Sequence, residues 1–453
     1  MIPVWHPNRL LRLTLVLACG ACATGGAAIR VADVTPSAIP SLEAQQSQHP
    51  HDANTLTRLG VAYFKAGRFE DARPVLDSAV AWDSSNGVAA IYLGMTAEQL
   101  GDFAVARAAY TRYVALAPNS DLRTTARDRL ALVGRRELEF QARQALAQEA
   151  TLAQMPPESN TVAVMPFTYT GSDSTIKPLG RGLAQLLITD LAKSRQIRVL
   201  ERDRMQAILD ELKLSDSAQA DPSTALRSGR LLRAADVVQG SIATLPGDQL
   251  RVDAAVVDVA SAGIKAAAGN QDALDRLFDL EKTLAFRVFN NLGIQLSPAE
   301  QEAINQRPTQ NVQAFLAYSR GLAAQDNGDF GAAAADFNQA AVLDPGFQAA
   351  VQGAASAGQL SAASQETVGQ VETAVSRSET LTPPGPTIAT AQQQVLSDGT
   401  NTVNATTGSE TVGTVGAPGT QPNPNKNPTS DATGQNGPGP VSGTVVITIT
   451  RPT

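Results

Sequence analysis

The chain has 453 residues, a formal net charge of −7 and an aromatic content of only 4%. This acidic balance argues against nucleic acid or an anionic membrane surface as a partner, because both favour concentrated Lys and Arg. Both cysteines and all three histidines lie within the first 51 residues. The body that follows therefore lacks the residues for a disulfide framework, a His-ligated zinc or a Ser-His-Asp triad. We predict no catalytic residue, no metal site and no cofactor.

Residues 1–23 have the pattern of an export signal. Arg9 and Arg12 precede a short apolar run at 13–18, too short to span a membrane comfortably. The Val-Leu-Ala-Cys sequence that follows approximates a lipoprotein cleavage box, which would place a lipid on Cys19. Cys22 is the alternative lipidation site, and simple cleavage near it without a lipid is a third outcome. We expect a periplasmic protein that is anchored to the outer membrane through this lipid.

A repeat with a period of 34 residues follows the segment 24–52, which is rich in Ala, Ser, Pro and Gln and which we predict to be a flexible linker. Leu59-Gly60 recurs as Leu93-Gly94, and the Gly, Phe and Ala at 67, 69 and 72 recur 34 positions later. The pattern resembles tetratricopeptide repeats. We expect residues 53–153 to form two repeats, a capping helix over 122–133 and a charged helix continuing toward the next domain.

A further unit of the same pattern is isolated at 309–350 and predicts a single tetratricopeptide-like helical pair. The sequence leaves open whether it packs on the neighbouring domain or on the first two repeats. In the usual repeat geometry, the first helices present five apolar side chains on the concave side: Val61, Phe64, Val88, Ile91 and Met95. They predict either a groove for an apolar peptide or partner helix, or a surface covered by the capping helix or the next domain.

The region 161–296 alternates strand and helix patterns. The apolar, β-branched run 161–167 predicts a buried strand, and 179–193 predicts a helix with a leucine stripe. The stretch 200–242 then predicts two helices, the second N-capped by Asp221. The later elements are a hairpin of strands at 237–245 and 250–259, a short strand at 264–268 and an amphipathic helix at 272–292. These elements predict a mixed α/β domain.

Particular residues of this region resemble the curli production assembly/transport (CsgG-like) family of outer-membrane lipoproteins. They are Leu200-Glu201-Arg202, Ile208-Leu209, Glu211, Leu214-Ser215, Asp221, Gly229, Leu232, Ala235-Asp236 and Gly240-Ser241-Ile242, with Val162 to Phe167 fitting the opening strand. The resemblance implies a periplasmic scaffold, without enzymatic activity, for assembly or secretion of a cell-surface structure. Related domains also occur in periplasmic activators of peptidoglycan synthases, which is the alternative function.

The resemblance also implies partners. These are other envelope proteins, bound through the repeats and the α/β domain, and the membrane, reached through a lipid anchor. A homo-oligomer is compatible with the family. Family channels carry two additional membrane-spanning hairpins per subunit, but here a tight turn at 246–248 and the segment 265–270 leave no room for them. We therefore expect the periplasmic fold without a pore.

Two motifs invite other interpretations. Gly180-Arg181-Gly182 lacks the third glycine and the lysine of a phosphate loop, so we interpret it as the entry turn of a helix. Four acids, Glu201, Asp203, Asp210 and Glu211, could be paired for hydrolysis, but the neighbouring Arg202 and Arg204 interleave with them. We expect these acids to be solvated and their pKa values not to be raised.

Residues 351–453 contain no aromatic side chain, and we predict a low-complexity, disordered C-terminal tail. The exception is 444–450, Thr-Val-Val-Ile-Thr-Ile-Thr, which predicts a strand that either pairs with a sheet edge or remains an unpaired end. The predicted fold class is thus α/β, a mixed sheet with helices, together with all-α tetratricopeptide repeats and this tail.

Overall fold

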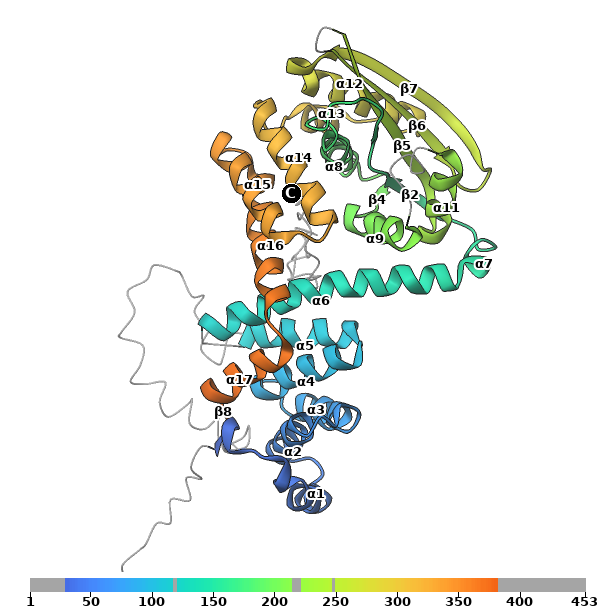
Figure 1. The fold of residues 1–453 in the computed structure, drawn as a ribbon. Coiled ribbons are helices and arrows are strands. Elements are labelled where there is room, and N and C mark those ends of the chain that lie inside the picture. The colour runs from blue at the N-terminus through green and yellow to red at the C-terminus, as the bar shows by residue number, and fades with distance from the viewer. Residues whose placement is uncertain (1–28, 117–119, 214–220, 247–248, 382–453) are drawn as a thin grey trace, which may run out of the picture.

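A computed structural model describes residues 29–116, 120–213, 221–246 and 249–381. The helical repeats and the mixed sheet lie at opposite ends of the molecule, and the long helix α6 (Ser120–Ala147) runs between them (Figure 1). Residues 1–28, with Cys19 and Cys22, and residues 382–453, with the predicted strand 444–450, lie outside the described residues.

The segment before the repeats is folded, so the predicted linker is wrong for most of its length. It contains β1 (Ile29–Arg30), two 3₁₀ turns, η1 (Val31–Asp33) and η2 (Pro36–Ala38), and α1 (Ile39–Gln48). Val31 and Leu42 are fully buried in the core of the repeats. The prolines that suggested a linker fall in the first turns of η2 and α1, where a missing N–H costs little.

The repeats are two antiparallel helix pairs, and a third pair with the same geometry lies further along the chain. The pairs are α2 (Ala53–Lys65) with α3 (Phe69–Trp82), α4 (Gly87–Leu100) with α5 (Phe103–Leu116), and α14 (Val312–Asp326) with α15 (Phe330–Leu343). In each pair a glycine of the first helix faces a large side chain of the second. A β-carbon at Gly60 would lie 2.4 Å from Leu76, and one at Gly94 would lie 2.9 Å from the ring of Tyr110.

Helix α6 packs both on the repeats and on the α/β domain. Its first half caps the repeats, with Leu122, Ala126 and Val133 in their core. Its second half places Leu138 and Ala142 against the α/β domain. The predicted capping helix and the charged helix after it are therefore one continuous element, followed by the short α7 (Glu149–Leu152).

The α/β domain is built on a mixed sheet in the order β4-β2-β5-β6-β7, with β3 also pairing with β5. Strand β2 runs parallel to β4 and β5, whereas β5, β6 and β7 are antiparallel neighbours. The last strand is longer than predicted, because its register with β6 continues to Ala273. The strands are β2 (Glu158–Val164), β3 (Thr168–Tyr169), β4 (Arg198–Val199), β5 (Ala234–Leu245), β6 (Gln249–Asp258) and β7 (Gly263–Ala273).

Helices cover both faces of this sheet, which confirms the predicted mixed α/β fold. Val238 and Val256 face one apolar core, with α8 (Leu179–Leu191) and α12 (Leu277–Asn291). Val237 and Val257 face the other, with α9 (Arg202–Leu212) and α11 (Pro222–Leu232). This alternation follows from the two-residue period of a strand. The turn η3 (Leu274–Arg276) precedes α12, and α13 (Pro298–Asn305) follows it.

The third helix pair packs on the α/β domain, which settles the question that the sequence left open. A β-carbon at Gly182 of α8 would lie 2.9 Å from Phe315 of α14, so these two helices are in close contact. The chain then continues into α16 (Gln348–Gln365), α17 (Val368–Ser378) and β8 (Thr380–Leu381).

The prediction of disorder is therefore wrong for residues 351–381. Small residues of α16 allow close helix packing without aromatic side chains, as where Gly353 lies against the ring of Phe337. Strand β8 pairs antiparallel with β1, so the two ends of the described chain meet.

Candidate functional site

The concave face of the repeats is filled by the chain itself. The five side chains predicted to line it converge as expected, but each is at least 93% buried: Val61, Phe64, Val88, Ile91 and Met95. We call these five residues the repeat groove. Its prediction as an open groove is wrong, and the surface is covered. The side chains that share one apolar core with the groove come from the capping helix α6, one of the covers that the sequence predicted, and also from α17 and the N-terminal segment 29–48, which it did not predict.

Helix α17 is amphipathic, with its apolar face on the repeats. Val368, Val371 and Val375 recur at three- and four-residue steps and are all buried. The opposite face, which includes Gln370 and Arg377, is exposed. A capping box between Thr367 and Gln370 fixes where the helix begins. Its burial pattern is that of a helix lying in a groove.

Polar contacts at the margin of the groove join donors of the repeats to the carboxylates of Glu372 in α17 and Glu379 directly after it. Tyr92 Oη donates to Glu372 over 2.9 Å, and Tyr113 Oη donates to Glu379 over 2.7 Å. Lys65 Nζ lies 3.7 Å from the Glu372 carboxylate. Burial raises the pKa of both tyrosines well above their usual value, so they remain neutral donors.

Lys65 also fixes the N-terminal segment. Its ammonium donates to the carbonyl oxygens of Val31 over 2.8 Å and Val34 over 3.1 Å. Burial lowers the pKa of Lys65, opposed by the nearby Glu372. The backbone N–H of Val31 in turn donates to the carbonyl of Glu379 over 3.3 Å. One lysine of the repeats thus joins both segments that cover the groove.

Sequence reasoning missed α17 because the composition of its surroundings suggested disorder. The signal was nevertheless present. Three valines at helical spacing follow a Thr-x-x-Gln capping pattern, which is typical of an amphipathic helix. What the sequence did not indicate was the surface against which this apolar face packs.

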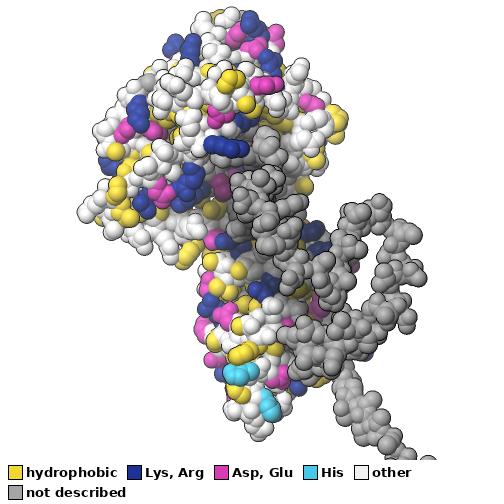
Figure 2. Space-filling view, turned by 180° about the vertical axis from the view of Figure 1, so that it is seen from behind, with side chains coloured by type: hydrophobic (Ala, Val, Ile, Leu, Met, Phe, Trp, Pro, Cys, Tyr) yellow, Lys and Arg dark blue, Asp and Glu magenta, His cyan; other side chains and the backbone are white. Residues whose placement is uncertain are grey.

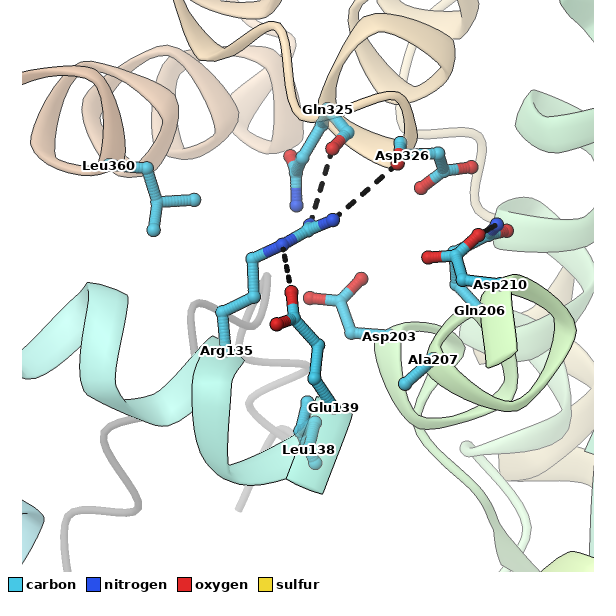
Figure 3. A pocket seen from close by; sticks show the side chains of 10 residues that line it. All are labelled: Arg135, Leu138, Glu139, Asp203, Gln206, Ala207, Asp210, Gln325, Asp326 and Leu360. Atoms are coloured by element: carbon cyan, nitrogen blue, oxygen red, sulfur yellow. Dashed lines mark hydrogen bonds and ion pairs between the residues drawn. The ribbon is translucent and has the colours of Figure 1, made fainter. Parts of the chain in front are cut away.

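A cluster of charged and polar side chains lies where α6, α9 and α14 meet. Asp326, whose side chain is 2% exposed, accepts from Arg181 Nε over 2.8 Å and pairs with Arg202. Arg202 pairs also with Asp203 over 2.6 Å. Figure 3 shows Arg135 of α6 reaching the end of α14, where it donates to the carbonyl of Gln325 over 3.2 Å. We call this cluster the polar joint.

The polar joint corrects the expectation for the acidic residues of α9. The pKa values of Asp203, Asp210 and Glu201 are all raised, in each case mainly by burial. The neighbouring arginines do not prevent this rise, because α6 and α14 pack over one side of α9 and remove water from it. Asp203 is therefore a partly buried partner of Arg202, with 21% of its side chain exposed, whereas Glu201 and Asp210 remain exposed as expected.

The cavity at the polar joint has room for about one water molecule. Its volume is about 20 Å³, and Gln206, one of the residues that line it, has a side-chain oxygen without a hydrogen-bond partner in the described part of the chain. A space of this size admits no organic substrate. The arrangement holds the α/β domain, α6 and the third helix pair together.

The Gly180-Arg181-Gly182 motif also serves packing. It begins α8, which confirms the helix-entry interpretation. A β-carbon at Gly180 would lie 1.9 Å from the carbonyl oxygen of Phe167, so only glycine fits there. The Arg181 side chain points into the polar joint and is held by Asp326.

Comparison with known proteins agrees with these two parts of the fold. The model of the family described as curli production assembly/transport component CsgG matches residues 143–275. The tetratricopeptide repeat model matches residues 35–87 and 57–121. No curated protein matches the chain.

Among solved structures, the chain is similar to the LpoB C-terminal domain from Salmonella enterica, with 12% identity and a TM-score of 0.22. That alignment covers 29% of this chain and 93% of the LpoB domain. Among the described helices, none combines the length and hydropathy that a bilayer crossing requires. The chain thus combines a CsgG domain with tetratricopeptide repeats, the combination that its sequence predicts.

Proposed function

We propose that this protein is a non-enzymatic scaffold of the cell envelope, which takes part in the assembly or secretion of a cell-surface structure. The observation that carries the proposal is α6, one continuous helix that packs on the repeats with its first half and on the α/β domain with its second. A partner bound at either end would be held at a fixed position relative to the other end. Tetratricopeptide repeats are in general protein-interaction modules, which supports this role.

The residue inventory supports a scaffold over an enzyme. No histidine or cysteine follows His51, so catalysis in the folded body would have to rely on other groups. The buried acids that the structure does bring together, at the polar joint, are paired with arginines. A screen of the purified protein for hydrolase activity tests this part, and we expect none.

We further propose that the protein lies in the periplasm, anchored to the outer membrane by a lipid on Cys19, with Cys22 as the alternative, and that it does not itself form a pore. The connections of the sheet support the last point. Leu245 pairs with Gln249 and Asp258 pairs with Gly263, so only three and four residues join these strands. Such turns leave no room for added membrane-spanning hairpins.

Fractionation with Cys19→Ser and Cys22→Ser variants tests the location. We expect the native chain in the membrane fraction, labelled by radioactive palmitate, and the Cys19→Ser chain unlabelled and in the soluble periplasm. Label lost only in the Cys22→Ser variant would move the lipid to the alternative site. A native chain recovered from the cytoplasm would contradict the proposed function.

Cross-linking in living cells, followed by purification of the full chain and identification of its partners, tests the role. Components of a surface or secretion structure are the expected partners. Recovery of a peptidoglycan synthase would instead favour the alternative function, a periplasmic activator of that enzyme. Absence of any envelope partner would contradict both.

A further inference from the structure

We propose that α17 is an exchangeable occupant of the repeat groove, and that an amphipathic, acidic helix of a partner protein takes its place. The inference deepens the proposed function, since it names what the repeats bind and how that binding is controlled. It rests on the position of α17 and on the chemistry of its contacts.

The apolar contacts define the shape of the helix that fits. Val368, Val371 and Val375 occupy positions i, i+3 and i+7, and all three are buried against the repeats. This spacing is the one by which helices bind in apolar grooves. A partner helix with medium-sized apolar residues at the same three positions would bury the same surface.

The polar contacts define the charge that a partner helix needs. The repeats present one ammonium and two hydroxyl donors, from Lys65, Tyr92 and Tyr113. The segment from α17 to β8 meets them with the carboxylates of Glu372 and Glu379. The partner helix therefore needs an acidic residue at position i+4, and a basic residue there would face Lys65.

The place of α17 in the fold allows it to leave. It is a single helix of 11 residues at the end of the described chain. Its departure would break the two-residue pairing of β8 with β1 and the hydrogen bonds of Glu372 and Glu379 described above, but no pairing within the main sheet. The helices of the repeats, α6 and the main sheet would keep their own contacts. An isolated helix of this length is not stable in water, so α17 would unfold when it leaves.

The groove cannot remain empty, so α17 leaves it only when another helix takes its place. Without α17, apolar side chains of this core that it covers, among them the buried ring of Tyr92, would face water. A tethered occupant acts at an effective concentration on the order of millimolar, so it competes strongly with weak or unrelated helices. The groove would therefore be closed until a helix of the right pattern is present at sufficient concentration.

Binding of a labelled peptide to full-length proteins tests the exchange. The probe is a fluorescent peptide of residues 366–381, with a control peptide that carries Glu372→Lys. The first protein is the native chain, in which α17 competes with the probe. The second carries Val371→Asp and Val375→Asp, which place charges on the buried face of α17 and so vacate the groove. Fluorescence anisotropy gives the dissociation constants.

A reversible lock supplies the third protein. Arg30 and Thr380 face each other in the β1–β8 pair at a non-hydrogen-bonded position, since the neighbouring Val31 N–H is the group bonded to Glu379. Cysteines at such a pair lie within the range of a disulfide. With Cys19 and Cys22 replaced by Ser, Arg30→Cys and Thr380→Cys would hold α17 in place when oxidised and release it when reduced.

We expect the vacated variant to bind the probe at least tenfold more tightly than the native chain, and to bind the Glu372→Lys peptide at least fivefold more weakly than the probe. The oxidised lock should not bind the probe, and reduction should restore the native dissociation constant. Equal binding by the oxidised and reduced lock would place the probe elsewhere and overturn the inference. So would an absence of binding to both a folded vacated variant and the reduced lock.

Circular dichroism shows whether the vacated variant is folded, and if it is not, the two redox states of the lock decide alone. These outcomes are separate from those of the proposed function. A failed exchange would leave scaffold partners on other surfaces unaffected, whereas a cytoplasmic location would leave the peptide result standing.

Discussion

Tyr92 Oη donates a 2.9 Å hydrogen bond to the carboxylate of Glu372, which lies 280 residues further along the chain. The bond joins the second repeat to the last helix of the described structure. It lies at the edge of an apolar contact, where it fixes the rotation and register of α17 on the repeats. The pair therefore gives a direct measure of how firmly α17 is held.

Replacing Tyr92 by Phe should loosen α17 without disturbing the repeats. The change removes one hydrogen bond to a charged acceptor and leaves Lys65 near Glu372, so we expect a loss of about 1 kcal/mol. That corresponds to roughly fivefold faster hydrogen exchange of the α17 amides. Tyr63→Phe is the matched control, because its hydroxyl donates to Glu43 on α1 over 2.6 Å. Equal exchange of α17 in the two variants would contradict the assignment.

Glu281 should make the protein less stable as pH rises through neutrality. Its side chain is 1% exposed, and burial, reinforced by the nearby Asp190, raises its pKa from 4.5 to about 8. Between these two pH values the folded protein holds a proton that the unfolded chain has released, so the free energy of unfolding falls with rising pH. The slope contributed by one such group is at most about 1.4 kcal/mol per pH unit.

Glu281→Gln should remove this slope, because the amide is neutral at every pH. We expect the variant and the native chain to have similar stability in urea at pH 5, and the variant to be more stable at pH 8. Glu300→Gln is a control of opposite sign. The Ser297 backbone N–H lowers the pKa of Glu300, so this change should lose stability at neutral pH and little at pH 3. Parallel curves for the native and Glu281→Gln chains from pH 5 to 8 would show that Glu281 does not titrate there.

Asp326→Asn should weaken the polar joint strongly. The Asp326 carboxylate is buried between Arg181 and Arg202, and its removal leaves two largely buried guanidinium groups with one remaining close carboxylate, that of Asp203. Breaking such a buried pair costs about 3 kcal/mol. Asp336→Asn, which removes a more exposed partner of Arg320, should cost less than about 1 kcal/mol. Urea unfolding measures both, and similar small losses would mean that the arginines find other partners.

Two glycine substitutions should have opposite effects on the midpoint of thermal unfolding. Gly94→Ala places a methyl group 2.9 Å from the ring of Tyr110 and should cost about 1–3 kcal/mol. Gly358→Ala, inside α16, meets nothing within 4 Å and should stabilise by about 0.5–1 kcal/mol. A stabilising Gly94→Ala would mean that the repeat helices can separate without loss.

The sequence was sufficient for features that depend on local spacing. The 34-residue period placed Gly60 and Gly94 at equivalent contacts, and Asp221 caps α11 as predicted, accepting from the N–H of Ser223 over 2.8 Å. The antiparallel hairpin of β5 and β6 also lies where the apolar runs indicated. These features follow from residue type and periodicity within a few tens of residues.

The sequence was not sufficient to predict features that depend on residues far apart in the chain. Val371 is buried because repeats some 280 residues earlier offer an apolar surface, and nothing in the alanine- and serine-rich context of α17 indicates this. The burial of Asp203 likewise depends on how α6 and α14 pack over α9. Composition indicates how much apolar surface a segment can bury by itself. It does not indicate which other part of the chain will pack against that segment.

The pairing of β1 with β8 would limit the distance from the membrane of a chain that carries the proposed lipid anchor. If the lipid is on Cys19, ten peptide units connect it to Ile29, and even fully extended they span about 35 Å. The repeats, the end of α17 and the start of the remaining 72 residues at Thr380–Leu381 would then lie close to the bilayer surface. The α/β domain packs on the other half of α6, away from the β1–β8 pair (Figure 1). A partner helix would thus bind to the repeats next to the lipid, whereas the α/β domain would lie at some distance from it.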